Sequence, residues 1–218
     1  PHLSIKPSIH SLGKSYKKLV STPAYLKLML AFSLASSMGY LFNSLAPVYI
    51  MTTYHLSAQT YGYLSILPGV GLLIGGYASQ KLAHKISAKK MILVAIIFML
   101  AASLGLSASL YLNNILGYLG SWGDLINLTF FIFYFSAILL FLGQALMISN
   151  AGMEALSHIK DHANGSSLMN AFALAGGSLM VSGVSHVFLL FNLSLPLVFL
   201  LLVLISLGLT SRVQALKI

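Results

Sequence analysis

The sequence of 218 residues contains no cysteine and only three acidic residues, and charged residues make up 7% of the chain. The absence of cysteine excludes disulfides, thiolate chemistry and metal sites built on cysteine. Soluble domains carry about 25% charged residues, so the composition excludes a globule that presents its surface to water. Disordered chains are polar and rich in charge, whereas 58% of these residues are hydrophobic. The remaining class is an integral membrane protein.

Six apolar stretches are long enough to cross the hydrocarbon core, which takes about 20 residues in a helix. None of them contains Asp, Glu or Arg, and none alternates apolar with polar residues as the strands of a membrane barrel do. The sequence therefore predicts an all-α integral membrane fold, with a six-helix transmembrane bundle over residues 24–211. The six stretches cover residues 24–51, 60–80, 91–111, 127–149, 166–190 and 195–211.

All twelve Lys and Arg residues lie in the N-terminal segment, in the second and fourth connections, and at the C-terminus. Cytoplasmic connections are enriched in Lys and Arg, so both termini are predicted to be cytoplasmic in a multi-pass protein of the bacterial inner membrane. The formal net charge of +9 then reflects contact with the headgroups of the lipid bilayer, and we expect no nucleic acid partner.

The two ends of the chain are predicted to lie outside the bundle. Residues 1–23 form an amphipathic cytoplasmic segment, in which Ile9, Leu12 and Tyr16 share one helical face and indicate a helix on the inner membrane surface. Residues 212–218 form a cytoplasmic tail. Because the chain begins at Pro1 and not at Met, we expect a fragment or a processed product.

Polar groups within hydrocarbon are costly and usually face protein or a water-filled cavity. In the first stretch, Tyr40 and Asn43 share a face with Ser36 and Pro47, which indicates either a cavity lining or a helix–helix contact. In the fourth stretch, Gln144 is an isolated amide that would bond either a substrate or a neighbouring helix. The polar stripes on the first, fourth and fifth stretches indicate that the third and sixth lie outside. The candidate cavity residues are Tyr40, Asn43, Tyr134, Phe141, Gln144 and Asn170.

Two further patterns are interpreted as structural. The aromatic run 130–135 is predicted to face lipid. The small and polar stripe on the fifth stretch favours helix packing, and it consists of Ser167, Asn170, Leu174, Ser178, Ser182 and Ser185.

The chain carries no pattern typical of an enzyme or of a cofactor site. It has no phosphate-binding glycine loop, and His158 and His162 have the four-residue spacing of a metal pair without the glutamate that accompanies it. We therefore expect no catalytic residues, no metal and no cofactor. His186 is a weaker candidate for a proton relay, because histidine titrates near physiological pH.

The connection between the second and third stretches carries the most specific pattern. Residues 75–93 contain a glycine at the end of a helix, a basic residue, a short turn and then paired basic residues. This pattern resembles the loop signature of the major facilitator superfamily, in the form of its C-terminal half. Ser79 and Gln80 stand near the place of the signature's acidic residue. The matching positions are Gly76, Lys81, Lys85, Lys89 and Lys90.

Two other segments extend the resemblance. Residues 13–30 resemble the central cytoplasmic loop that leads into the seventh span of a twelve-span carrier. Residues 149–179 resemble the connection between spans ten and eleven of Bcr/CflA-type drug-resistance transporters, through Asn150, Ala151, Ala163, Gly165, Ser166 and Ser167. The resemblance implies that the chain is spans seven to twelve of a transporter, with the missing N-terminal six-helix half as its partner.

The resemblance also implies a function, which is proton-coupled efflux of a small lipophilic substrate by alternating access. The first, second, fourth and fifth spans would line the cavity, and the loop signature would take part in gating. The three acids, Asp124, Glu154 and Asp161, lie in connections or at span ends, so a proton-carrying carboxylate is expected in the missing half. The residues themselves leave an alternative open: a complete six-span protein that acts as a homodimeric carrier or channel.

Overall fold

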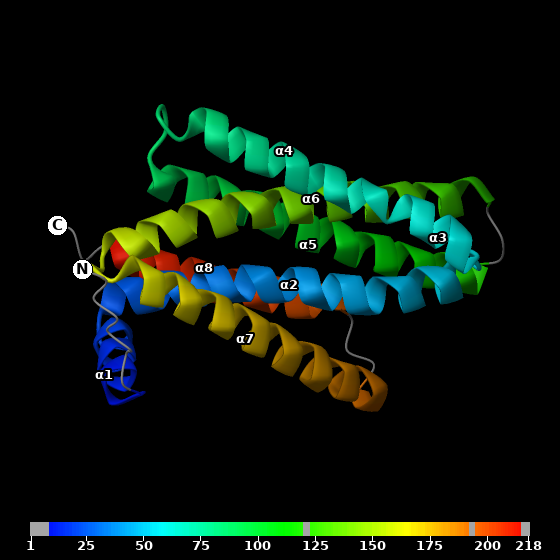
Figure 1. The fold of residues 1–218 in the computed structure, drawn as a ribbon. Helices are drawn as coiled ribbons and strands as arrows, with labels where there is room; N and C mark the ends of the chain where they lie inside the picture. The colour runs from blue at the N-terminus through cyan, green and yellow to red at the C-terminus, as the bar shows by residue number, and fades with distance from the viewer. Residues whose placement is uncertain (1–8, 120–122, 192–194, 215–218) are drawn as a thin grey trace.

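A computed structural model describes residues 9–119, 123–191 and 195–214, and the side chains of residues 13–115, 127–186 and 197–211 (Figure 1). Every element in these ranges is a helix. The bounds are α1 Ile9–Val20, α2 Pro23–Thr53, α3 Ala58–Leu64, α4 Ile66–Leu82, α5 Ala88–Leu119, α6 Gly123–Ser157, α7 His162–Phe191 and α8 Leu195–Gln214.

The lengths and apolar composition of these helices make the chain an all-α membrane protein. Five segments in the described residues are long and apolar enough to cross a bilayer: α2, α3 with α4, α5, α6 and α7. The corresponding apolar part of α8, Leu197–Ser211, is shorter. The count of six spans therefore stays a prediction, whereas the membrane location and the helical class follow from the structure.

The polar residues between the third and fourth stretches predict a loop over residues 112–126, and this prediction is largely wrong. Helix α5 continues to Leu119 and α6 begins at Gly123, because residues 112–119 contain no proline and their one glycine costs a helix only about 1 kcal/mol. The leucines of this segment are good helix formers and extend α5. Trp122, expected at the membrane interface, lies outside the described residues.

The second predicted span is broken in two at Ser65. Helix α3 is capped by the Ser57 side chain, which accepts a hydrogen bond from the Thr60 backbone N–H at 3.1 Å. Proline has no N–H, and its ring clashes with the carbonyl four residues earlier. Pro68 therefore accounts for the break, because that carbonyl belongs to Leu64, the last residue of α3.

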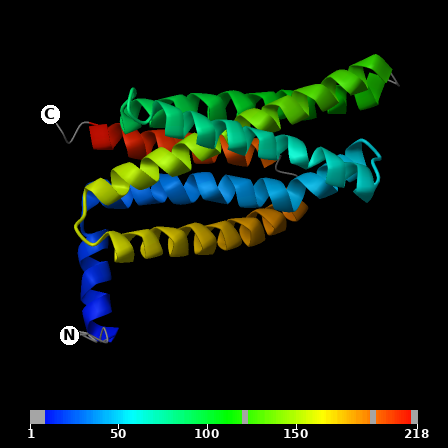
Figure 2. The ribbon, with the colours of Figure 1, turned by 45° about the horizontal axis from the view of Figure 1, so that its top comes forward.

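The helices form two layers (Figures 1 and 2). One layer is a row in which α4 packs on α6, α6 on α2, and α2 on α7. The second layer is the pair α5 and α8, with α5 packed on α6 and α8 packed on α2. The third and sixth predicted spans correspond to α5 and α8, which pack directly on α6 and α2. That they lie outside the helices with polar stripes stays a prediction. Helices α2 and α6 lie in the middle of the row, and α4 and α7 form its two ends.

Close packing in the row depends on glycine. Gly71 and Gly75 lie against the backbone of α6, where an added Cβ would collide with the carbonyl oxygens of Ile138 and Leu142. Small residues four positions apart let helix backbones approach closely. The spacing of Gly71 and Gly75 therefore predicts helix packing, and the structure confirms it. Next to this contact, the Asn150 side-chain amide donates a buried hydrogen bond of 2.9 Å to the Ser79 hydroxyl.

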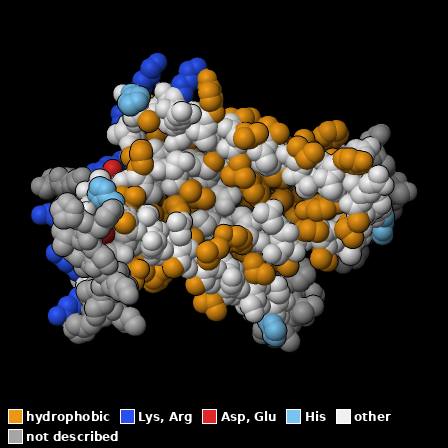
Figure 3. All heavy atoms as spheres, viewed as in Figure 1, with side chains coloured by type: hydrophobic (Ala, Val, Ile, Leu, Met, Phe, Trp, Pro, Cys, Tyr) orange, Lys and Arg blue, Asp and Glu red, His pale blue; other side chains and the backbone are white. Residues whose placement is uncertain are grey.

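Helix α1 runs crosswise to the long helices and projects from one end of the bundle (Figure 2), and its place on the inner membrane surface stays a prediction. Its last turn is anchored by Leu19, which is 5% exposed. The turn between α4 and α5 and the turn between α6 and α7 lie at the same end (Figure 1). The described Lys side chains gather there, while hydrophobic side chains cover the length of the bundle (Figure 3).

Candidate functional site

The exposed strip of α2 is the first part of the candidate site. This helix is packed by α6, α7 and α8, yet Tyr40 is 41% exposed and Asn43 and Ser44 are exposed as well. Ser36 and Pro47 are half-buried and lie on the same face, as their spacing predicts. A central helix of the bundle therefore presents hydroxyl and amide groups on its one open side.

Tyr40 joins this strip to α7. An added side chain at Gly177 would collide with the Tyr40 ring, so the ring contacts α7 at this glycine. Glycine is what allows this contact, because any larger residue would push the phenol away. Tyr40 could be selected from its place among the polar residues of the first stretch. Gly177 carries no such signal, because its role depends on a residue 137 positions earlier in the chain.

The small and polar stripe of α7 is exposed, and the prediction that it serves helix packing is wrong. Ser185 is half-buried, and the other five members of the stripe are exposed, including Asn170 and Ser178. The reason is that α7 packs on α2 through a neighbouring face that carries Met169, Ala173 and Gly177. Polar side chains of α7 therefore lie on an open surface of the helix that Tyr40 contacts.

Gln144 lies inside the bundle, between α6 and α2. It is 7% exposed, and its amide fills the space that a side chain at Gly39 would occupy. The oxygen Oε1 accepts no hydrogen bond from any described residue, and an unsatisfied buried acceptor of this kind costs about 1–3 kcal/mol. The structure thus places Gln144 within reach of α2, with one acceptor available.

The aromatic residues of α6 are also interior. Phe141 is 4% exposed and meets Phe42 edge to face at 5.3 Å between ring centroids. Tyr134, likewise 4% exposed, packs on Phe130 at 4.8 Å, and its hydroxyl accepts or donates no hydrogen bond among the described residues. The candidate cavity residues therefore form two groups: Tyr40, Asn43 and Asn170 on the surface, and Tyr134, Phe141 and Gln144 within the core.

The aromatic run 130–135 serves two surfaces. Phe131 and Phe135 are exposed, as expected for lipid-facing residues. Phe133 is buried and stacks on Tyr49 at 5.6 Å between ring centroids, which corrects the prediction for this residue. The aromatic partners on α2 were not recognised from the sequence, because Tyr49 is more than 80 residues away from this run.

The residues of the loop signature lie at the basic end of the bundle. Gly76 has open space around its Cα, unlike its neighbour Gly75. Lys81 lies in the last turn of α4 with its ammonium 5.5 Å from the centre of the Tyr77 ring. Lys85 follows in the connection, and the remaining pair, Lys89 and Lys90, starts α5. The structure brings these side chains to one turn, and their gating role stays a prediction.

Titratable groups lie at the ends of the helices. Glu154, in the last turn of α6, and His158, which directly follows this helix, approach to 3.7 Å. Hydrogen bonds from the Asn164 side chain and backbone N–H lower the pKa of Asp161, at the start of α7. His186 is exposed near the other end of α7, and the Asp124 side chain lies outside the described residues. Within the described residues, no three His, Asp or Glu side chains gather into a metal site.

No family model matches the chain, and no curated protein matches it.

Proposed function

We propose that this chain is the six-span, C-terminal half of a secondary active transporter, and that it exports a small lipophilic molecule by alternating access. The observation that carries the proposal is the pair of exposed polar strips on α2 and α7. These helices pack on each other, and the Tyr40 ring bridges them at Gly177. Asn43 and Ser178 project from the strips without burial in the bundle.

A polar strip within the hydrocarbon region favours a water-filled path over lipid. An amide exposed to hydrocarbon loses its hydrogen bonds with water, and polar groups at membrane depth therefore face protein or water. The strips lie on the row α4–α6–α2–α7, which contains the four helices that the major facilitator resemblance assigns to the cavity. The resemblance and the exposed polar groups thus both support this row of helices as the lining of the transport cavity.

Coupling to protons would depend on the other half. The apolar middle of each span in this chain contains no carboxylate, since Glu154 lies in the last turn of α6, Asp161 in the connection to α7, and Asp124 at the start of α6. The chain would then contribute aromatic and amide groups to the substrate site, while the partner half contributes the titrating group. The basic end, with both termini, would lie in the bacterial cytoplasm, as the distribution of Lys and Arg predicts.

A homodimer of this chain is the second candidate, because the same strips could face a second copy. A homodimeric carrier or channel would need no other half. The coding region immediately upstream of Pro1 distinguishes the two. Six further apolar stretches in frame would support the half-transporter, and a start codon at that place would support the homodimer.

The absence of cysteine provides a direct test. Thiols react with maleimides only where water reaches them, because the thiolate is the reactive form. We expect Asn43→Cys and Ser178→Cys to be labelled by a membrane-impermeant maleimide in membranes. Leu104→Cys is the matched control, because Leu104 is 58% exposed but lies on the apolar outer face of α5. Labelling of the control alone, or of none of the three, would contradict the proposal.

A further inference from the structure

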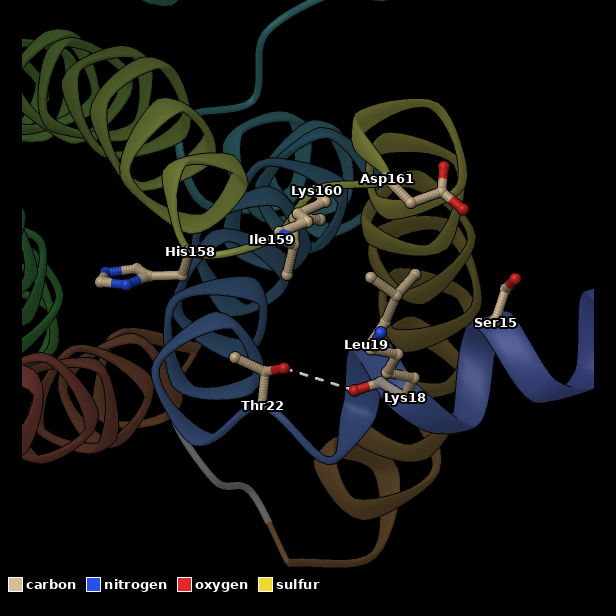
Figure 4. A pocket seen from close by; sticks show the side chains of 8 residues that line it. All are labelled: Ser15, Lys18, Leu19, Thr22, His158, Ile159, Lys160 and Asp161. Carbon is tan, nitrogen blue, oxygen red and sulfur yellow. Dashed lines mark hydrogen bonds between the residues drawn. The ribbon is translucent and has the colours of Figure 1, made fainter.

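A pocket of about 360 Å³ lies at the basic end of the bundle, away from the polar strips. It is lined by three segments: the C-terminal half of α1, Thr22 in the connection to α2, and the turn between α6 and α7 (Figure 4). Its lining combines two lysines with apolar and hydroxyl groups: Ser15, Lys18, Leu19, Thr22, Ile159 and Lys160.

The walls of this pocket are fixed by buried contacts. Leu19 is 5% exposed and holds α1 to the bundle. The Tyr25 hydroxyl donates a hydrogen bond of 2.7 Å to the Gly165 carbonyl, which joins the start of α2 to the start of α7. The Thr22 hydroxyl donates to the Lys18 carbonyl at 3.3 Å and holds the turn between α1 and α2. These contacts hold in place the segments that carry Lys18 and Lys160, so both lysines are attached to a packed part of the bundle.

The charge of the pocket is positive. Lys18 and Lys160 are exposed, and Lys14 and Lys17 lie on the same helix as Lys18. The one carboxylate in the lining, Asp161, accepts hydrogen bonds from Asn164, and both it and the His158 ring point away from the centre of the pocket (Figure 4). An anion in the pocket would therefore meet two ammonium groups.

We infer that this pocket binds the phosphate of an anionic phospholipid headgroup. Two observations favour a lipid over a free phosphate ion. Leu19 and Ile159 give the pocket an apolar side, which fits the glycerol and the first methylenes of the acyl chains. The second is that the pocket lies against α1, whose basic and amphipathic sequence predicts a place on the membrane surface, where headgroups gather. Basic pockets between membrane helices are typical headgroup sites.

The test measures lipid retention by the full chain in detergent with native mass spectrometry, and it does not depend on transport. Phosphatidylglycerol is the anionic probe and phosphatidylcholine the zwitterionic one. We expect the variant Lys18→Gln with Lys160→Gln to bind phosphatidylglycerol about 30-fold more weakly, since each lysine near a headgroup contributes about fivefold. Replacement of both lysines by arginine should preserve binding, because the charges remain.

The matched control replaces Lys81 and Lys85 by glutamine. These lysines are exposed at the same end of the bundle but lie outside the pocket, so the control removes the same charge. An equal loss in the control, or equal retention of phosphatidylcholine by the unaltered chain, would overturn the site. Displacement of the lipid by inorganic phosphate at matched concentration would overturn the assignment to a lipid. Unchanged far-ultraviolet circular dichroism would show that the variants fold.

Discussion

Replacement of Gly71 by alanine tests the packing of α4 on the bundle. In the described residues of α4, burial is confined to a narrow stripe that consists of Pro68, Gly71, Gly75 and Ser79. An added Cβ at Gly71 would collide with the Ile138 carbonyl oxygen of α6. This oxygen belongs to a helix backbone and cannot rotate away as a side chain would. The methyl group therefore has to push the two helices apart.

The added methyl group overpacks the contact between α4 and α6, and overpacking lowers the free energy of unfolding by about 1–3 kcal/mol. Gly76→Ala is the matched control, because nothing lies within 4 Å of a Cβ added at Gly76. Both variants gain about 1 kcal/mol of helix propensity, so this contribution cancels between them. We expect the free energy of unfolding of Gly71→Ala to be about 1–3 kcal/mol below that of Gly76→Ala. The Tm would differ by about 2–4 °C per kcal/mol at this chain length.

The assay is thermal unfolding of the purified chain in one detergent, followed by circular dichroism of the helical signal. The two variants can be compared directly, because both replace glycine by alanine within six residues of one helix and are measured in the same detergent. A Tm for Gly71→Ala equal to or above that of Gly76→Ala would refute the close contact between α4 and α6.

Two other substitutions test polar contacts at the ends of the helices. Asn150→Ala removes the buried hydrogen bond to Ser79. A double-mutant cycle with Ser79→Ala should give a coupling free energy of about 0.6 kcal/mol, the average for such bonds in membranes. A coupling free energy of zero in thermal unfolding would contradict a stabilising bond. Asp161→Ala should lower the Tm, because the carboxylate accepts the backbone N–H of the third residue of α7. Its pKa is lower in the folded chain, so this stabilisation is present above the unfolded pKa of about 4 and is lost as the pH falls through the folded pKa. The Tm values of the variant and the unaltered chain should therefore converge in acid, and a constant difference down to low pH would contradict this.

The helices could be predicted from the sequence because the bilayer imposes one requirement on every span. Backbone groups in hydrocarbon must bond within their own segment, so apolar length alone locates the helices. The ends of the helices depend on local chemistry. The polar residues Asn113 and Asn114 indicated a loop, yet the helix continues through them, since nothing in that segment prevents its hydrogen bonds.

The candidate site was harder to predict, because periodicity tells which residues share a face and not what covers that face. The strip with Tyr40 and Asn43 is open and the face with Gln144 is covered, although both carry isolated polar groups in apolar helices. The difference arises from partners such as Gly39, which brings α2 close enough to bury the amide. A contact of this kind joins residues more than 100 positions apart and leaves no periodic signal in either segment.

The central position of α2 has a consequence for biosynthesis. Ribosomes deliver the chain from its N-terminus, so α2 enters the bilayer before α6, α7 and α8, the three long helices that surround it. The bond from Tyr25 to Gly165 closes a span of 140 residues, so the second of its two groups is made long after the first. During synthesis α2 therefore stays in lipid, or beside the insertion machinery, until α6, α7 and α8 cover its glycine and serine faces. The contacts around α2 are completed only after α6, α7 and α8 have been made.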